Sequence, residues 1–318
     1  MSDSNAEPGG ATPPNPGTPA NPWSAPTGQQ PPPLPYGAMP AMNPVGPAPM
    51  RPIITPKKVL GPGHIYWGLG QVWIGLGVAI GLNTVVGLVW MGFWLAKNGG
   101  SLTPSDLPGI SEKVLSDLTS SPLFVLASLL TLWFGFLLGV WLASYRNGQR
   151  SLALDFGWRF VWRTDIAFGI GLAVLLRLAD AGFSALVTAL GVNPKSIDNS
   201  GPILDQKGLA LVVIVIAASV GAPIVEELFF RGLTLRALQK RWGAVVGIIG
   251  SSLLFGLLHA QPDAAGQLGL QSLWLVLFTA LLGAVLAWVA VKTNRLGITV
   301  IAHVTFNLSA LMIALIWS

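Results

Sequence analysis

The chain has 318 residues, of which 52% are hydrophobic and only 10% are charged, with a mean hydropathy of +0.62. Soluble domains carry about 25% charged residues, so the composition predicts an integral membrane protein. Cysteine is absent, which excludes disulfides, thiolate metal sites and a cysteine nucleophile. The net charge of +5 does not indicate a nucleic-acid partner, because the basic residues cluster in short loops beside apolar segments, as membrane topology requires.

The first part of the chain, residues 1–58, is rich in Pro, Gly, Ala and Asn. Such a segment has too little apolar surface to offset the entropy cost of ordering, so it is predicted to be a disordered tail, partly in the polyproline II conformation. The run Pro-Pro-Pro-Leu-Pro at 31–35 is a candidate ligand for a partner with an aromatic groove. A simple solvated tail is the alternative.

Seven apolar segments follow, and a membrane span needs about 20 apolar residues. The sequence therefore predicts an all-α, polytopic membrane helical bundle with about seven transmembrane helices. Residues 59–200 hold the N-terminal helices, and 201–318 hold the remainder. The segments are 65–96, 122–144, 166–191, 208–230, 244–260, 271–291 and 297–317.

Basic residues predict the orientation, because cytoplasmic loops carry an excess of Lys and Arg. With the N-terminus in the cytoplasm, thirteen basic residues fall in inner loops and four in outer loops. We therefore predict a multi-pass cell-membrane protein with a cytoplasmic N-terminus and an outward C-terminus. The inner set is Arg51, Lys57, Lys58, Arg146, Arg150, Arg159, Arg163, Arg231, Arg236, Lys240, Arg241, Lys292 and Arg295, and the outer set is Lys97, Lys113, Lys195 and Lys207.

Residues 151–165 form a separate short segment. Trp158 and Trp162 are four residues apart, as are Arg159 and Arg163. This spacing is typical of a helix that lies in the membrane interface. A plain basic loop is the alternative.

Three polar clusters interrupt the later apolar segments: EELFFR at 226–231, FGLLH at 255–259 and HVTFN at 303–307. An ionisable group inside a membrane helix costs roughly 2.5–3.5 kcal/mol on insertion scales, which makes each one a candidate for function. Two carboxylates, a guanidinium and two of the three histidines lie in these clusters. We therefore expect them to share one interior site.

The spacing of these residues suggests how they meet. Glu227 and Arg231 are one helical turn apart and are expected to pair, which leaves Glu226 facing another direction. If the fourth and fifth segments form a hairpin that turns near residues 241–243, Glu226 and His259 lie at the same depth. His303 is about 12 Å into the last span at 1.5 Å per residue, and Asn307 follows one turn later.

Two chemistries suit this set of residues. In the first, Glu226 and His259 activate a water that attacks a peptide carbonyl, while His303 and Asn307 stabilise the oxyanion. In the second, Glu226, His259 and His303 bind zinc, with an open position for water. The common zinc signature HExxH is missing, because Ala260 and Gln261 follow His259.

The three motifs EExxxR, FxxxH and HxxxN, in this order on successive apolar segments, resemble the CPBP family of intramembrane proteases. That family includes type II CAAX prenyl endopeptidases and bacterial members linked to bacteriocin processing or immunity. The stretch Ala-Pro-Ile-Val-Glu-Glu-Leu-Phe-Phe-Arg-Gly at 222–232 is similar to the bacterial form of the first motif. The resemblance covers roughly residues 208–310, and eukaryotic CAAX members have eight spans rather than seven.

The resemblance implies an intramembrane endopeptidase, with residues 201–318 as its catalytic core. Glu226 matches the catalytic glutamate and His259 its partner histidine. His303 and Asn307 match the pair that stabilises the transition state. Glu227 and Arg231 complete the first motif.

Members of this family are often described as metalloproteases, so zinc is retained as a candidate cofactor. The expected partners are the lipid bilayer and a membrane-associated protein or peptide substrate, and nothing in the sequence indicates that the substrate is prenylated. Two alternatives come from other function classes. The first is a non-enzymatic scaffold or bacteriocin-immunity protein that retains the protease fold. The second is a proton-coupled transporter.

Overall fold

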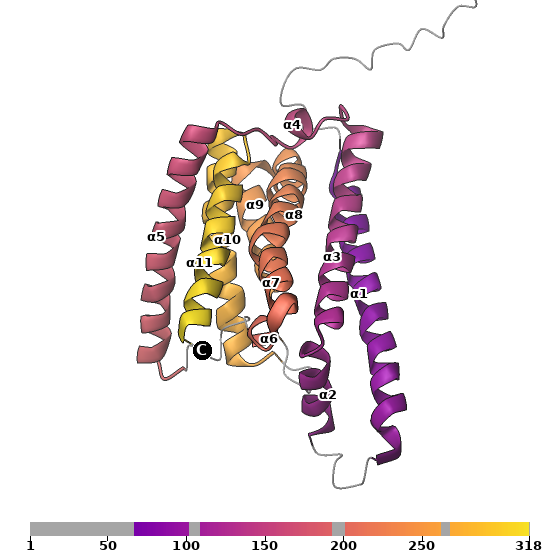
Figure 1. Ribbon diagram of the computed structural model, residues 1–318. Helices are drawn as coiled ribbons and strands as arrows, with labels where there is room; N and C mark the ends of the chain where they lie inside the picture. Colours follow the sequence, from indigo (N-terminus) through magenta and orange to yellow (C-terminus); the bar gives the residue numbers. More distant parts are fainter. Residues whose placement is uncertain (1–66, 102–108, 193–200, 262–267, 318) are drawn as a thin grey trace, which may run out of the picture. The chain divides into compact units, whose positions relative to one another are not determined.

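The computed structural model describes residues 67–101, 109–192, 201–261 and 268–317 of the chain. All of these residues belong to one compact unit, Val59–Ser318. Every regular element within the described ranges is a helix, in agreement with the predicted all-α class (Figure 1). The prediction for the tail 1–58 lies outside the described residues.

The helical elements follow one another with short connections. Most are α-helices; η1 is a 3₁₀-helix, and η3, η5 and η6 are π-helical. In chain order they are α1 Leu69–Asn98, η1 Gly99–Ser101, α2 Ile110–Thr119, α3 Pro122–Leu142, η3 Ala143–Asn147, α4 Leu152–Asp155, α5 Trp162–Ala189, α6 Gly201–Leu204, α7 Gly208–Ile216, η5 Ala217–Gly221, α8 Ala222–Glu226, η6 Glu227–Thr234, α9 Leu235–Leu257, α10 Leu270–Thr293 and α11 Gly297–Trp317.

Six helical runs among the described residues are long and apolar enough to cross a membrane, so the chain is a multi-pass membrane protein. The expected number was about seven. The difference arises because the fourth and fifth predicted segments both lie in the continuous run Gly208–Leu257. Within that run, Gly243 has a φ of 86°, a left-handed conformation that interrupts α9 and that glycine adopts at no steric cost.

The two parts of α9 fold against each other at this interruption. A methyl group placed on Gly247 would lie 3.1 Å from the carbonyl oxygen of Leu235, and one on Gly250 would lie 3.1 Å from Leu238. The predicted hairpin near residues 241–243 is therefore confirmed. Its second limb, residues 244–257, is too short for a full membrane span, which needs about 20 residues.

The connection between α3 and α5 does not form the single helix predicted for residues 151–165. α4 provides one turn, after which the backbone is non-helical up to Val161. Gly157 has a φ of 72°, and its carbonyl accepts a hydrogen bond of 2.8 Å from the N–H of Leu296. The Trp and Arg pairs at 158–163 therefore do not share a helical face. The placement of this segment in the membrane interface stays a prediction.

A buried carboxylate fixes this connection. Asp155 accepts a hydrogen bond of 2.6 Å from Ser144 Oγ and one of 2.9 Å from the N–H of Gln149. A second buried carboxylate, Asp165, accepts from the N–H of Val161 at 2.7 Å and pairs with Arg295. These polar contacts, rather than an amphipathic face, determine the path of the chain from α3 to α5.

Small residues allow the long helices to approach closely, as is usual in membranes. α1 packs along α3, α9 along α10, and α5 along α11 (Figure 1). A methyl group on Gly135 of α3 would collide with the backbone of Ala79 in α1. A methyl group on Gly256 of α9 would lie 2.5 Å from the carbonyl oxygen of Val276 in α10.

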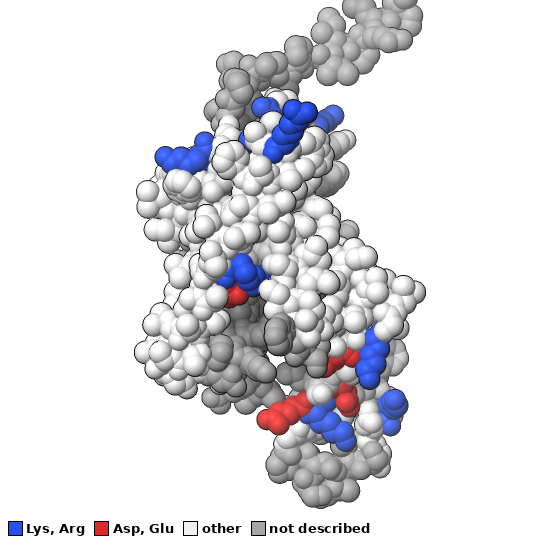
Figure 2. All heavy atoms as spheres, turned by 60° about the vertical axis from the view of Figure 1, so that its left-hand side comes forward, with Lys and Arg blue, Asp and Glu red and all other residues white. Residues whose placement is uncertain are grey.

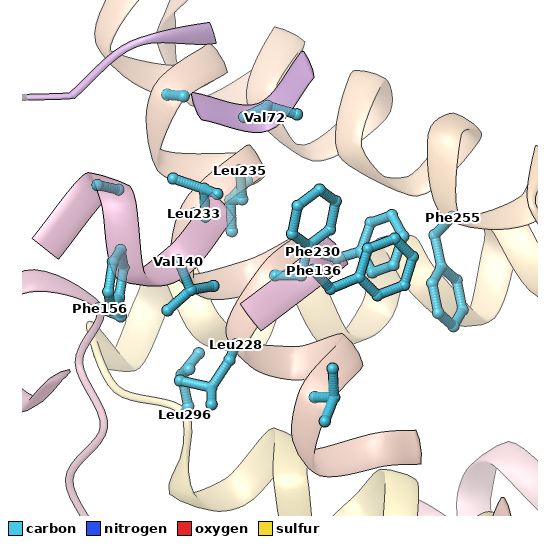
Figure 3. Packing of buried hydrophobic residues seen from close by; sticks show 14 of the residues in the cluster. Val72, Phe136, Val140, Phe156, Leu228, Phe230, Leu233, Leu235, Phe255 and Leu296 are labelled. Carbon is cyan, nitrogen blue, oxygen red and sulfur yellow. The ribbon is translucent and has the colours of Figure 1, made fainter. Parts of the chain in front are cut away.

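An aromatic cluster fills the space between α3, η6 and α9 (Figure 3). Phe136 stacks on Phe229 with ring centroids 4.4 Å apart, and Phe230 lies edge-on to Phe255 with centroids 5.0 Å apart. Edge-to-face and offset pairs at these separations contribute about 0.5–1.5 kcal/mol beyond the area they bury. The cluster therefore gives η6, which follows Glu226, a rigid support.

Basic side chains gather at one end of this unit, which we call the basic end. The start of α1, the end of α3, the start of α5, the turn in α9 and the α10–α11 connection meet there, through contacts such as Gln71–Asn147 and Asp165–Arg295. Figure 2 shows blue side chains at this end, a mostly white middle, and mixed red and blue side chains at the other end. The described basic residues of this end are Arg146, Arg150, Arg159, Arg163, Arg236, Lys240, Arg241, Lys292 and Arg295.

Candidate active site

A π-helical turn beside a proline creates one polar contact of the site. In η5 the N–H of Ala222 donates to the carbonyl of Ala217, five residues back. In this pattern the next carbonyl, that of Ala218, would need the N–H of Pro223, which proline lacks. Instead, Asn307 Nδ2 donates to the Ala218 oxygen at 3.3 Å. This bond fastens α11 to the turn that precedes Glu226.

The second glutamate of the first motif forms a buried ion pair. Glu227 Oε1 lies 3.0 Å from Arg231 NH1, and the two side chains are 0% and 1% exposed. Arg231 also donates to the carbonyl of Gly283 at 3.3 Å, and its guanidinium lies 4.4 Å from the ring centroid of Phe255. The predicted Glu227–Arg231 pair is confirmed, and it connects η6 with α9 and α10.

His303 lies between the two glutamates. Its Nδ1 is 3.0 Å from Glu227 Oε1, and its Nε2 is 3.6 Å from Glu226 Oε2. Since an ionised carboxylate only accepts hydrogen bonds, the Nδ1–H of His303 donates to Glu227. The sequence predicted that His303 approaches the site, but it gave no signal that this ring bridges both carboxylates.

The end of α9 determines the orientation of His259. Its backbone N–H bonds to the carbonyl of Gly256, so the carbonyl of Phe255 loses its usual helical partner. That carbonyl lies 2.8 Å from His259 Nδ1. Because a carbonyl can only accept, Nδ1 carries the proton of this hydrogen bond, and in the tautomer protonated on Nδ1 alone Nε2 is a lone-pair acceptor. The ring of Phe255 also packs against this imidazole, with ring centroids 4.6 Å apart.

The predicted convergence of the motifs is confirmed, because one cavity of about 610 Å³ is lined by Glu226, His259, His303 and Asn307. Glu226 is 18% exposed, whereas the neighbouring Glu227 is fully buried. Glu226 is therefore the carboxylate of the pair that faces the cavity. Glu227 and Arg231 lie behind it and hold its neighbours in place.

Sequence reasoning did not predict that α5 contributes to this cavity. Arg177 and Asp180 both line it, and they form an ion pair at 2.7 Å. Arg177 also donates to the carbonyl of Phe306 at 2.6 Å, which lies between His303 and Asn307 in the chain. An ion pair inside an apolar span was the available signal, but the sequence alone indicated only mutual neutralisation.

The zinc alternative finds no support in the arrangement of the side chains. Among the described residues, no group of three or more His, Asp or Glu side chains is placed to hold a metal ion. The predicted set of Glu226, His259 and His303 lines one cavity but does not form such a group.

Comparisons with known proteins agree with the motifs. Residues 208–309 match the family described as "Type II CAAX prenyl endopeptidase Rce1-like". The resemblance to CPBP proteases is confirmed. The matched region begins with α7 and ends within α11, so it includes all three motifs of the CPBP family, while the α5 pair of Arg177 and Asp180 lies outside it.

One curated relative is also similar to the chain. It is "Putative membrane peptidase YdiL" of Bacillus subtilis (strain 168), which is 27% identical over 165 residues. The similarity covers 52% of this chain and 59% of the relative, so it spans less than two thirds of that protein. No solved structure matches the chain. The roles of individual residues therefore rest on the geometry described above.

Proposed function

We propose that the protein is an intramembrane endopeptidase that hydrolyses a peptide bond of a membrane-associated protein or peptide with an activated water. The observation that carries the proposal is the shared cavity of Glu226, His259, His303 and Asn307. The match to CPBP proteases supports the same reaction class. Because no sulfur or serine nucleophile motif accompanies these residues, water is the nucleophile that the set suits best.

In the first step, Glu226 and His259 accept hydrogen bonds from the water. The carbonyl of Phe255 accepts the Nδ1–H of His259, which leaves Nε2 of this ring to accept a hydrogen bond from the water. As the water oxygen bonds to the peptide carbonyl carbon, its proton passes to one of these bases. General-base assistance of this kind contributes roughly 10²–10⁴-fold to the rate.

In the same step, negative charge develops on the substrate oxygen, and His303 and Asn307 donate to it. Asn307 uses one N–H for Ala218, which leaves the second for the oxyanion. His303 can donate from Nε2 only when both ring nitrogens carry protons, since Nδ1–H is directed to Glu227.

In the second step, the carbon–nitrogen bond breaks and the tetrahedral intermediate collapses to a carboxylic acid. The proton taken from water is delivered to the leaving nitrogen, so the products are one new carboxyl group and one new amine. Both steps therefore use the same four side chains of the cavity. Two act as bases, Glu226 and His259, and two as hydrogen-bond donors, His303 and Asn307.

The proposal includes an orientation. The basic end, with nine described Lys and Arg residues, is placed in the cytoplasm, because inner loops are enriched in these residues. The N-terminus is then cytoplasmic and the C-terminus faces outward.

The test is cleavage of membrane-peptide substrates by purified wild-type protein, by Glu226→Gln and by the matched control Glu112→Gln. Glu112 lies in the first turn of α2, outside the cavity, so its variant should cleave normally. Glu226→Gln should be inactive. Full biological activity of Glu226→Gln, with no cleavage by wild type, would instead indicate a scaffold that retains the protease fold.

A further inference from the structure

Within the described residues, the cavity lining extends from the candidate site in one direction. Along α11 its lining runs from His303 to Ala314, and along α5 from Arg177 to Val187. Both helices start at the basic end, so these stretches lead away from it. On α10, which runs the opposite way, the lining lies between Leu275 and Leu282, in the first half of the helix. The lining is therefore displaced toward the end opposite the basic residues.

The side of the site nearer the basic end is closed by packed residues. Three side chains on this side are at most 1% exposed: Glu227, Arg231 and Phe230. The ring of Phe255 packs against the guanidinium of Arg231. Gly283 fits tightly there, because a methyl group on it would lie 3.1 Å from Phe255 and 3.2 Å from Arg231. Phe255 both lines the cavity and packs against Arg231, so its ring forms the cavity wall on this side.

The walls beyond the reactive groups are mainly apolar. They include Phe183, Val187, Phe278, Leu311 and Ile313. From His303 to Ala314 the cavity extends about 16 Å, at 1.5 Å per residue of helix. An extended peptide rises about 3.3 Å per residue, so this length accommodates roughly five residues.

We propose that the substrate enters from the end opposite the basic end and binds with an extended hydrophobic segment in the cavity lined by α5, α10 and α11. This proposal rests on the peptidase function proposed above and names its substrate class. The substrate is a peptide segment with about five apolar residues on one side of the cleaved bond. With the basic end in the cytoplasm, the cleaved segment reaches the site from the outer half of the bilayer.

Water access to the cavity tests the direction without any need for activity. The chain contains no cysteine, so each single-cysteine variant carries one thiol and needs no background substitution. The probes are Ser184→Cys and Ala310→Cys, both in the cavity wall. Thr164→Cys at the start of α5 marks the basic end, and Ser116→Cys in α2 marks the other end.

Oriented membrane vesicles of each variant are treated with a membrane-impermeant maleimide from one side at a time. The proposal expects Ser184→Cys and Ala310→Cys to react from the same side as Ser116→Cys. Reaction from the side of Thr164→Cys, or from neither side, would overturn it. Absence of peptide cleavage together with the expected labelling would refute only the peptidase function.

Cleavage then tests the hydrophobic segment. Ala310→Trp places a large side chain in the cavity and should lower the cleavage rate by about tenfold or more, because the indole would occupy the space proposed for the substrate segment. Ala185→Trp, at an exposed position of α5 outside the lining, is the matched control and should cleave normally. Equal rates for the two variants, or a preference for peptides that are polar throughout, would contradict the proposal.

Discussion

His303 shares the buried carboxylate of Glu227 with Arg231, since its Nδ1 and the NH1 of Arg231 both lie 3.0 Å from the same oxygen. This arrangement fixes the plane of the imidazole and leaves Nε2 on the side of Glu226. The second glutamate of the motif therefore acts through its neighbours: it balances the arginine and orients the histidine.

Removal of Arg231 should destabilise the protein, because Glu227 would be left as a buried, uncompensated charge. Breaking such a pair costs roughly 3–5 kcal/mol, whereas replacing both partners by apolar residues is often neutral. We expect Arg231→Met to lower the unfolding temperature in detergent. The double variant Glu227→Leu/Arg231→Met should regain most of this stability.

The double variant should nevertheless remain poorly active, because His303 loses the acceptor of its Nδ1–H. Cleavage assays on the same preparations check this separation of stability from activity. Wild-type activity in a stable double variant would show that Glu227 does not orient His303.

The Asn307–Ala218 hydrogen bond can be tested through the proline that makes it necessary. Asn307→Ala leaves the partly buried Ala218 carbonyl without its side-chain donor, and the loss of one such hydrogen bond costs about 0.5–1.5 kcal/mol. Pro223→Ala restores a backbone N–H at the position where the π-turn lacks one. We therefore expect Asn307→Ala to cost less stability in the Pro223→Ala background than in wild type.

A double-mutant cycle, measured by unfolding in detergent, gives this coupling directly. Additive effects of the two substitutions would mean that the Ala218 carbonyl is not what links them. Cleavage should stay low in both Asn307→Ala variants, since the second N–H of Asn307 is proposed to donate to the oxyanion.

The packing of α1 on α3 predicts a contrast between two glycines. Gly135→Ala should destabilise by roughly 1–3 kcal/mol, the usual cost of overpacking, because its methyl group would meet the Ala79 backbone. Gly77→Ala has nothing within 4 Å of the added methyl, so it should be neutral or slightly stabilising. Unfolding in detergent measures both, and equal effects would contradict the described packing.

Periodicity and spacing in the sequence predicted the local parts of this structure. The apolar segments became helices, Glu227 and Arg231 paired one turn apart, and the chain reversed at Gly243. These features depend on neighbours in the sequence. The bridging position of His303 and the bond from Asn307 to Ala218 depend instead on how α11 packs against η5 and η6, which single-segment patterns do not encode.

Of the two alternatives for residues 151–165, the continuous helix is not formed, and this has a related cause. The spacing of the Trp and Arg residues there is typical of a helix, but the buried Asp155 binds Ser144 and Gln149. These hydrogen bonds stabilise a tight turn that competes with a continuous helix. Polar contacts between non-adjacent residues thus override the amphipathic pattern.

Cleavage should continue in the presence of a chelator. The described side chains contain no group of three or more His, Asp or Glu residues that could hold a metal ion. Wild-type protein assayed with and without EDTA should therefore give equal rates. Loss of activity in EDTA, followed by recovery on addition of Zn²⁺, would contradict the water-only chemistry.

Glu226 is proposed to activate the attacking water, rather than to stabilise the fold or to bind the substrate. The most direct test compares Glu226→Gln with wild type on one cleaved peptide, measuring both the single-turnover rate and the dissociation constant. We predict a rate lower by about 100-fold or more with a nearly unchanged dissociation constant. An unchanged rate would contradict the account.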